Sequence, residues 1–167
     1  MKTLEYETLD VFTDTKFEGN PLAVVMDGRG LSIDDMLTIT REFNYSETTF
    51  VLPPENPDNT ARVRIFTLGY EMPFAGHPTV GTAIAIARAR KLSGDLRLEL
   101  NTGVFKVKVD LDRPVPYAGF LNPNLPMETG VAPDTALIEA ALSLPKGSVD
   151  RGAHRPPDCD QSAGGGW

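Results

Sequence analysis

The chain has 167 residues, of which 41% are hydrophobic and 23% charged, and its formal net charge at pH 7 is −7. A chain of this size and composition is an ordinary globular protein with one good core, and its acidic balance argues against nucleic acid or an anionic membrane as a partner. The single cysteine excludes an internal disulfide, and a chain with one cysteine and two histidines is a poor candidate for a zinc site. Because the sequence contains neither a membrane-length apolar run nor a signal peptide, we expect a cytoplasmic protein.

The first part of the chain alternates short apolar strands with one amphipathic helix. The helix is predicted over residues 32–43, because Ser32 followed by Asp35 resembles a capping box with the shorter acid and apolar residues then recur at helical spacing. The strands are predicted from their apolar or alternating runs, bounded by turn residues. They cover residues 3–13, 22–26, 48–52 and 61–66.

The stretch 66–91 organises the rest of the chain, and its second half is predicted to be a helix with Pro78 at the first helical position. Residues 80–89 are mostly apolar or small on every side, so this helix is expected to be buried all round, with basic residues at its carboxyl end. Its amino end offers free N–H groups, with Gly76 and Gly81 allowing close approach. Next to His77, this end is predicted to be the floor of an anion-binding active site.

The remaining strands complete the expected fold. Residues 95–100 and 105–109 alternate around a short loop with glycine and predict a hairpin, and residues 116–121 are a further strand. We predict an α+β domain, in which a curled, mixed but mostly antiparallel sheet wraps around the buried helix. A capped helix is predicted over residues 133–142, and the sequence from Gly147 onward has too few aliphatic residues to fold.

Motifs alone leave the functional residues open. The spacing from Gly76 to Thr82 superficially spells a phosphate loop, but the required lysine is missing, so nucleotide binding is rejected. His77 is either catalytic or a histidine that caps the helix. Glu47 follows a helix and precedes a strand, as catalytic loop residues often do, yet the residue pattern alone favours a solvated surface carboxylate. Three other acidic residues could be argued in the same way: Glu71, Asp14 and Glu18.

Four blocks of sequence resemble the phenazine-biosynthesis PhzF-like isomerase/epimerase family, in its order and approximate spacing. They are Glu18 to Val25 (EGNPLAVV), Arg41 to Thr48 (REFNYSET), Arg64 to Thr67 (RIFT) and Pro73 to Ala83 (PFAGHPTVGTA). The resemblance covers about residues 3–121 and implies the diaminopimelate epimerase fold, with two similar domains that face each other across the active site. It implies an N-terminal domain at 1–122, and we expect residues 123–146 to be the start of a truncated second domain. From its composition and its lack of family blocks, we expect the stretch 147–167 to be disordered and frame-shifted.

The resemblance also implies site residues and a reaction. Glu47 falls on the family's acid/base glutamate and His77 on its substrate-polarising histidine, while Gly76 and the helix amino end would hold a substrate carboxylate. Three further positions are expected to contact the substrate: Asn20, Pro78 and Thr79. The implied activity is a cofactor-independent allylic proton shift on a small carboxylated metabolite. With half of the cleft missing, Glu47 is expected to lie in water, which leaves two alternatives open: an inactive half that binds a small anion, or a protein-binding domain. An uncovered apolar face would favour a homodimer.

Overall fold

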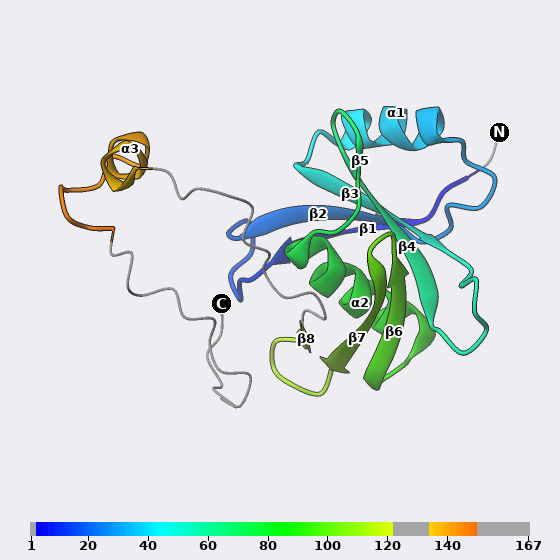
Figure 1. Ribbon diagram of the computed structural model, residues 1–167. Helices are drawn as coiled ribbons and strands as arrows, with labels where there is room; N and C mark the ends of the chain where they lie inside the picture. The colour runs from blue at the N-terminus through cyan, green and yellow to red at the C-terminus, as the bar shows by residue number, and fades with distance from the viewer. Residues whose placement is uncertain (1–2, 122–133, 150–167) are drawn as a thin grey trace. The chain divides into compact units, whose positions relative to one another are not determined.

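The computed structural model of the protein describes residues 3–121 and 134–149 (Figure 1). The chain divides into two compact units, Met1–Asn124 and Leu125–Trp167, which we describe separately. The predicted boundary near residue 122 and most of the stretch 147–167 lie outside the described residues, so these domain assignments stay predictions.

The described residues of the first unit form one eight-stranded sheet with the order β1-β2-β3-β4-β6-β7-β8, in which β5 pairs with β4. The strands are β1 (Tyr6–Val11), β2 (Asn20–Val25), β3 (Glu47–Leu52), β4 (Ala61–Thr67), β5 (Glu71–Met72), β6 (Gly94–Leu100), β7 (Gly103–Asp110) and β8 (Tyr117–Phe120). The pairs β2/β3 and β4/β6 are parallel and the other pairs are antiparallel. The sheet is therefore mixed and mostly antiparallel, as predicted.

Helix α2 (Gly76–Arg90) lies in the hollow of this sheet (Figure 1). It contacts β1, β2 and β3 toward one end of the sheet and β7 and β8 toward the other, which requires the sheet to curl around it. Every residue from His77 to Ala87 is buried. A helix that is apolar on all sides needs cover on all sides, and the curled sheet provides it. The predicted α+β fold is confirmed.

Helix α1 (Ile33–Phe43) covers the outer face of the sheet. Its capping box is complete, because the Ser32 hydroxyl accepts the Asp35 N–H and the Asp35 carboxylate accepts the Ser32 N–H. Met36 packs with Val25, Phe50 and other apolar residues in a small outer core. The helix ends at Asn44 in the left-handed conformation.

One local prediction needs correction, and one short strand was not predicted. Pro78 is not the first residue of α2: the helix begins at Gly76 after the N-cap Ala75, so Pro78 is the third helical residue. Proline is tolerated there because the first-turn N–H groups have no partner within a helix. The two-residue strand β5 was not predicted, since a segment so short has no periodicity to detect; it pairs with Ile65 and Phe66 of β4.

Gly81 explains how closely α2 approaches the sheet. A Cβ atom at this position would lie 2.6 Å from Leu22 Cδ2 and 2.9 Å from Val11 Cγ2. Both distances are shorter than real carbon contacts allow. The absence of a side chain at Gly81 therefore lets α2 sit directly on β1 and β2, one turn beyond His77.

The second unit contains α3 (Thr135–Ala141), which begins at the N-cap Asp134 and agrees with the helix predicted over 133–142. Glu139 is 6% exposed, and its Oε1 accepts hydrogen bonds from the N–H groups of Gly147 and Val149.

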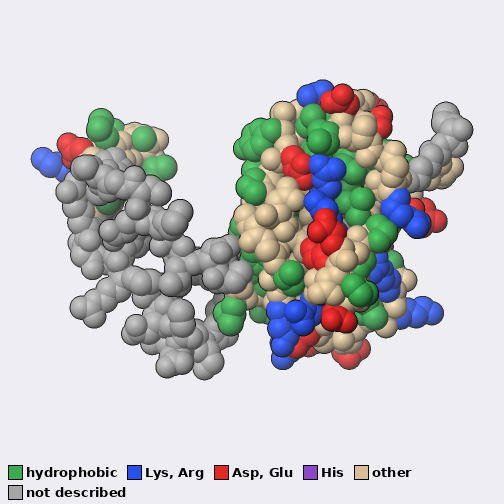
Figure 2. Space-filling model, turned by 45° about the vertical axis from the view of Figure 1, so that its right-hand side comes forward, with side chains coloured by type: hydrophobic (Ala, Val, Ile, Leu, Met, Phe, Trp, Pro, Cys, Tyr) green, Lys and Arg blue, Asp and Glu red, His purple; other side chains and the backbone are tan. Residues whose placement is uncertain are grey.

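Among the described residues of the whole chain, no helix is both long and apolar enough to cross a membrane. Charges of both signs are interspersed with hydrophobic side chains on the face drawn in Figure 2.

Candidate active site

The pleat of two neighbouring strands brings Asn20 and Glu47 to the same place. In β3, Thr49 and Val51 face α2 and Phe50 faces outward, so Glu47, two residues before Thr49, also faces α2. In β2, Leu22 faces α2 in the same way, which places Asn20 on the inner face. Because β2 and β3 are parallel, both strands begin at the same edge of the sheet.

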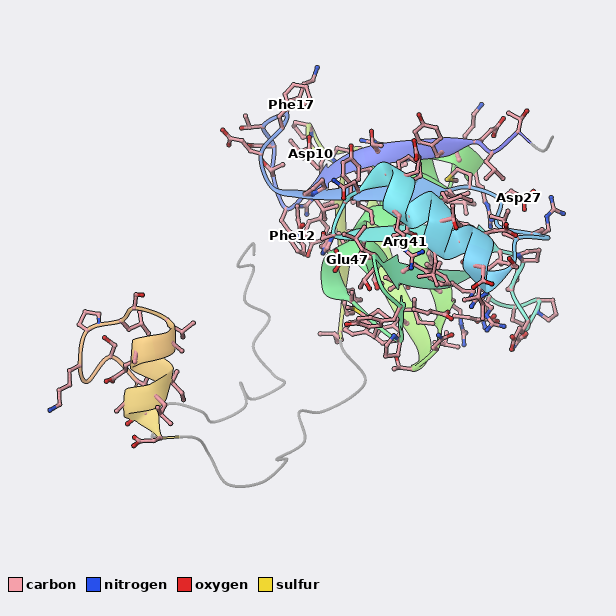
Figure 3. All side chains as sticks on the ribbon, turned by 90° about the horizontal axis from the view of Figure 1, so that it is seen from above. Asp10, Phe12, Phe17, Asp27, Arg41 and Glu47 are labelled. Atoms are coloured by element: carbon pink, nitrogen blue, oxygen red, sulfur yellow. The ribbon has the colours of Figure 1, made fainter. Side chains whose placement is uncertain are left out.

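Glu47 and His77 face each other at this edge. Glu47 Oε2 lies 3.3 Å from His77 Nε2, and the two side chains are 15% and 8% exposed. Neither atom has a well-aligned hydrogen-bond partner among the described residues. The expectation that Glu47 lies in bulk water is therefore wrong, because the strand directs its side chain against α2. Figure 3 places Glu47 toward the end of the domain from which Phe12 and Phe17 project, opposite Asp27.

The second ring nitrogen of His77 is held by β2. Asn20 Nδ2 lies 3.0 Å from His77 Nδ1. Burial lowers the pKa of His77 below its ordinary value of 6.5, against the opposing effects of the Glu47 charge and the Pro21 carbonyl. The imidazole is consequently neutral near pH 7, and a neutral ring has one donor and one acceptor nitrogen.

The amino end of α2 adds an electropositive pole to the site. Its N-cap, Ala75, provides no side-chain hydrogen bond, so the first N–H groups of the helix have no side-chain cap. A Cβ atom at Gly76 would meet nothing within 4 Å, so the space beside the first residue of the helix is open. Pro78 and Thr79 are buried, and the Thr79 hydroxyl donates to the Ala75 carbonyl. Substrate contact by Gly76, Pro78 and Thr79 stays a prediction.

The other acidic candidates lie apart from this arrangement. Glu71 accepts two hydrogen bonds from Arg64 across β4 and β5 and a third from Asn101, which is a structural role. Asp14 and Glu18 are exposed in the β1–β2 loop. Within residues 3–121 and 134–149, no three potential metal-ligating side chains cluster.

The assembled groups have the chemistry that proton transfer and the binding of an anion require. A buried carboxylate oxygen without a hydrogen-bond partner can take a proton, and an imidazole N–H beside it can polarise a substrate oxygen. The uncapped helix end can bind a carboxylate. Sequence reasoning missed the contact between Asn20 and His77, because these residues are 57 positions apart and no local pattern joins them.

Proteins that resemble this chain include several that are named as isomerases and one that is named as a predicted epimerase. A model of phenazine biosynthesis-like proteins matches residues 9–160, which extends beyond the end of the resemblance at residue 121. A protein of Mesorhizobium japonicum named as an uncharacterized isomerase is 46% identical over 157 residues, 93% of this chain and 52% of the relative. The trans-2,3-dihydro-3-hydroxyanthranilate isomerase of Pseudomonas chlororaphis is 39% identical over 135 residues, 81% of this chain and 48% of the relative.

Two solved structures that resemble this chain come from a predicted epimerase and from a PhzF-family protein. A predicted epimerase from Pseudomonas aeruginosa superposes with a TM-score of 0.64 at 35% identity, covering 70% of this chain and 42% of that chain. A PhzF-family phenazine biosynthesis protein from Bacillus anthracis superposes with a TM-score of 0.60 at 36% identity, covering 67% of this chain and 38% of that chain. Fold and site together define a domain of the diaminopimelate epimerase-like class. The chain belongs to the phenazine biosynthesis-like (PhzF) family, and it spans about half the length of the curated relatives it matches.

Proposed function

We propose that this chain carries the acid/base half of an isomerase site that moves a proton between two carbons of a small carboxylated metabolite. Glu47 is the base that removes the proton and the acid that returns it. His77 donates from Nε2 to a substrate oxygen, and the amino end of α2 binds the substrate carboxylate. Membership of a family whose named relatives include isomerases supports this proposal.

The reaction balances without an external reagent. Glu47 takes a proton from one carbon, the electron pair of that C–H bond becomes part of a shifted double bond, and the resulting anion is delocalised toward the oxygen that His77 polarises. The carboxyl group then returns a proton to a different carbon, so the product is an isomer of the substrate. One group can perform both steps when both carbons lie on the same side of it.

The facing pair of Glu47 Oε2 and His77 Nε2 carries the proposal. Buried polar atoms are nearly always hydrogen-bonded, and leaving one unpaired costs about 1–3 kcal/mol. Here two such atoms lie 3.3 Å apart beside an uncapped helix end. This cost is understandable if both atoms take part in binding and reaction with a substrate.

The direct test incubates the full chain with a probe compound in deuterated water and measures the deuterium that enters the probe. The probes are trans-2,3-dihydro-3-hydroxyanthranilate, other cyclic dienoic acids and amino acids. We expect incorporation by the wild type and a loss of about 100-fold or more in Glu47→Gln. The matched control is Glu42→Gln, which makes the same change at an exposed carboxylate of α1. Equal incorporation by the wild type and Glu47→Gln would refute the assigned role of Glu47.

A second candidate, favoured by the uncapped helix end and the open space beside Gly76, is a module that binds a small carboxylate without catalysis. This alternative predicts that the wild type and Glu47→Gln bind such a ligand similarly and that neither incorporates deuterium. Calorimetric titration with the same probes distinguishes the two candidates.

A further inference from the structure

The contact between Asn20 and His77 has a directional consequence. The nitrogen of a carboxamide can donate a hydrogen bond but cannot accept one. Asn20 Nδ2 lies 3.0 Å from His77 Nδ1. A hydrogen bond between these two atoms requires Nδ1 to be the acceptor. In the neutral ring the remaining proton is then on Nε2, the nitrogen that faces Glu47.

We propose that Asn20 is a positioning residue that fixes the tautomer of His77 with its proton on Nε2, rather than a residue that contacts the substrate. Its effect on the reaction rests on the proposed function, since the Nε2 proton is the one offered to a substrate oxygen. The tautomer itself is a property of the free chain and can be measured without any substrate.

The opposite tautomer would place two hydrogen-bond acceptors, His77 Nε2 and Glu47 Oε2, against each other. A hydrogen bond between the ring and the Pro21 carbonyl raises the pKa of His77. If Nδ1 were the donor of this bond, the proton of the neutral ring would be on Nδ1. The lone pair of Nε2 would then face Glu47 Oε2 at 3.3 Å, two acceptors with no proton between them. Among the described residues, Glu47 is the charged group that acts on this ring. Donation from Asn20 to Nδ1 keeps the ring proton on Nε2 and so avoids this repulsion.

The test is nitrogen-15 NMR of the full chain with labelled histidine. The chain has two histidines, and His154→Gln assigns the signals. We expect the wild-type spectrum at neutral pH to show a protonated Nε2 and an unprotonated Nδ1 on His77. In Asn20→Asp the new carboxylate accepts from Nδ1–H, so we expect the proton to move to Nδ1 and the pKa of His77 to rise. Asn44→Asp is the matched control at an exposed helix end, where neither change is expected.

Two spectroscopic results would overturn the proposal: a proton on Nδ1 in the wild type, or an unchanged tautomer and pKa in Asn20→Asp. Kinetics provides a further check. A positioning role predicts that Asn20→Asp lowers kcat about tenfold or more with little change in KM, whereas a rise in KM alone would mean that Asn20 contacts the substrate. If the tautomer responds as expected but no variant exchanges protons with any probe, the positioning of His77 stands and the proposed function fails.

Discussion

The close packing of α2 on the sheet predicts that Gly81→Ala destabilises the protein. Alanine is normally preferred to glycine inside a helix by about 1 kcal/mol. Here the added Cβ would lie 2.6 Å from Leu22 Cδ2 and 2.9 Å from Val11 Cγ2. Leu22 is fully buried and Val11 is 5% exposed, so neither side chain can rotate into free space. Overpacking of this kind costs about 1–3 kcal/mol, which outweighs the helix preference.

We expect the free energy of unfolding to fall by about 1–2 kcal/mol, measured by urea unfolding followed by far-UV circular dichroism. Gly76→Ala is the matched control on the same helix, because its Cβ would meet nothing within 4 Å, and its stability should stay within about 0.5 kcal/mol of the wild type. Leu22→Val removes the clashing Cδ atoms, so the cost of Gly81→Ala should be smaller in that background. A Gly81→Ala variant as stable as the wild type would show that α2 does not pack this tightly on β2.

Three further predictions concern stability. The buried Thr49 and Thr82 hydroxyls lie 2.8 Å apart. Thr82→Val removes the nearer partner of the Thr49 hydroxyl and leaves it only the longer hydrogen bond, 3.5 Å, to the Ala23 carbonyl. The change should cost about 1–3 kcal/mol in urea unfolding, and adding Thr49→Val should recover part of this loss. Ser32→Ala removes the hydroxyl of the capping box and should cost about 1 kcal/mol, whereas Ser32→Asp should cost less. Burial, opposed by the charge of Glu47, lowers the pKa of His77. The folded state therefore binds fewer protons than the unfolded state just below pH 6.5, and wild-type stability should fall more between about pH 7 and 5 than that of His77→Gln.

Local sequence patterns predicted most helices and strands, because capping residues and the spacing of apolar residues lie within each segment. The capping box at Ser32 marks the start of α1, and the apolar run after Val80 marks a helix buried on all sides. The start of α2 was misplaced because Pro78 is compatible with several first-turn positions. Strand β5 was missed because two residues have no measurable period.

The site depended on information that no short segment contains. Two parallel pairings bring distant strands together, and β2/β3 aligns the starts of the segments that carry Asn20 and Glu47. Composition could not separate Glu47 from Glu71, whose partner Arg64 is visible only once β4 and β5 are paired. The family resemblance identified Glu47 and His77 because it compares whole blocks in order, whereas the contact from Asn20 to His77 required coordinates.

The central claim is that one carboxyl group, Glu47, both removes and returns the proton. The most direct measurement uses trans-2,3-dihydro-3-hydroxyanthranilate carrying deuterium on the carbon that loses a proton, incubated with the full chain in ordinary water. We expect a measurable share of the deuterium to appear on the accepting carbon, on the same face of the molecule, and this transfer to vanish in Glu47→Gln. Delivery of the new hydrogen to the opposite face, or transfer that survives in Glu47→Gln, would contradict the account.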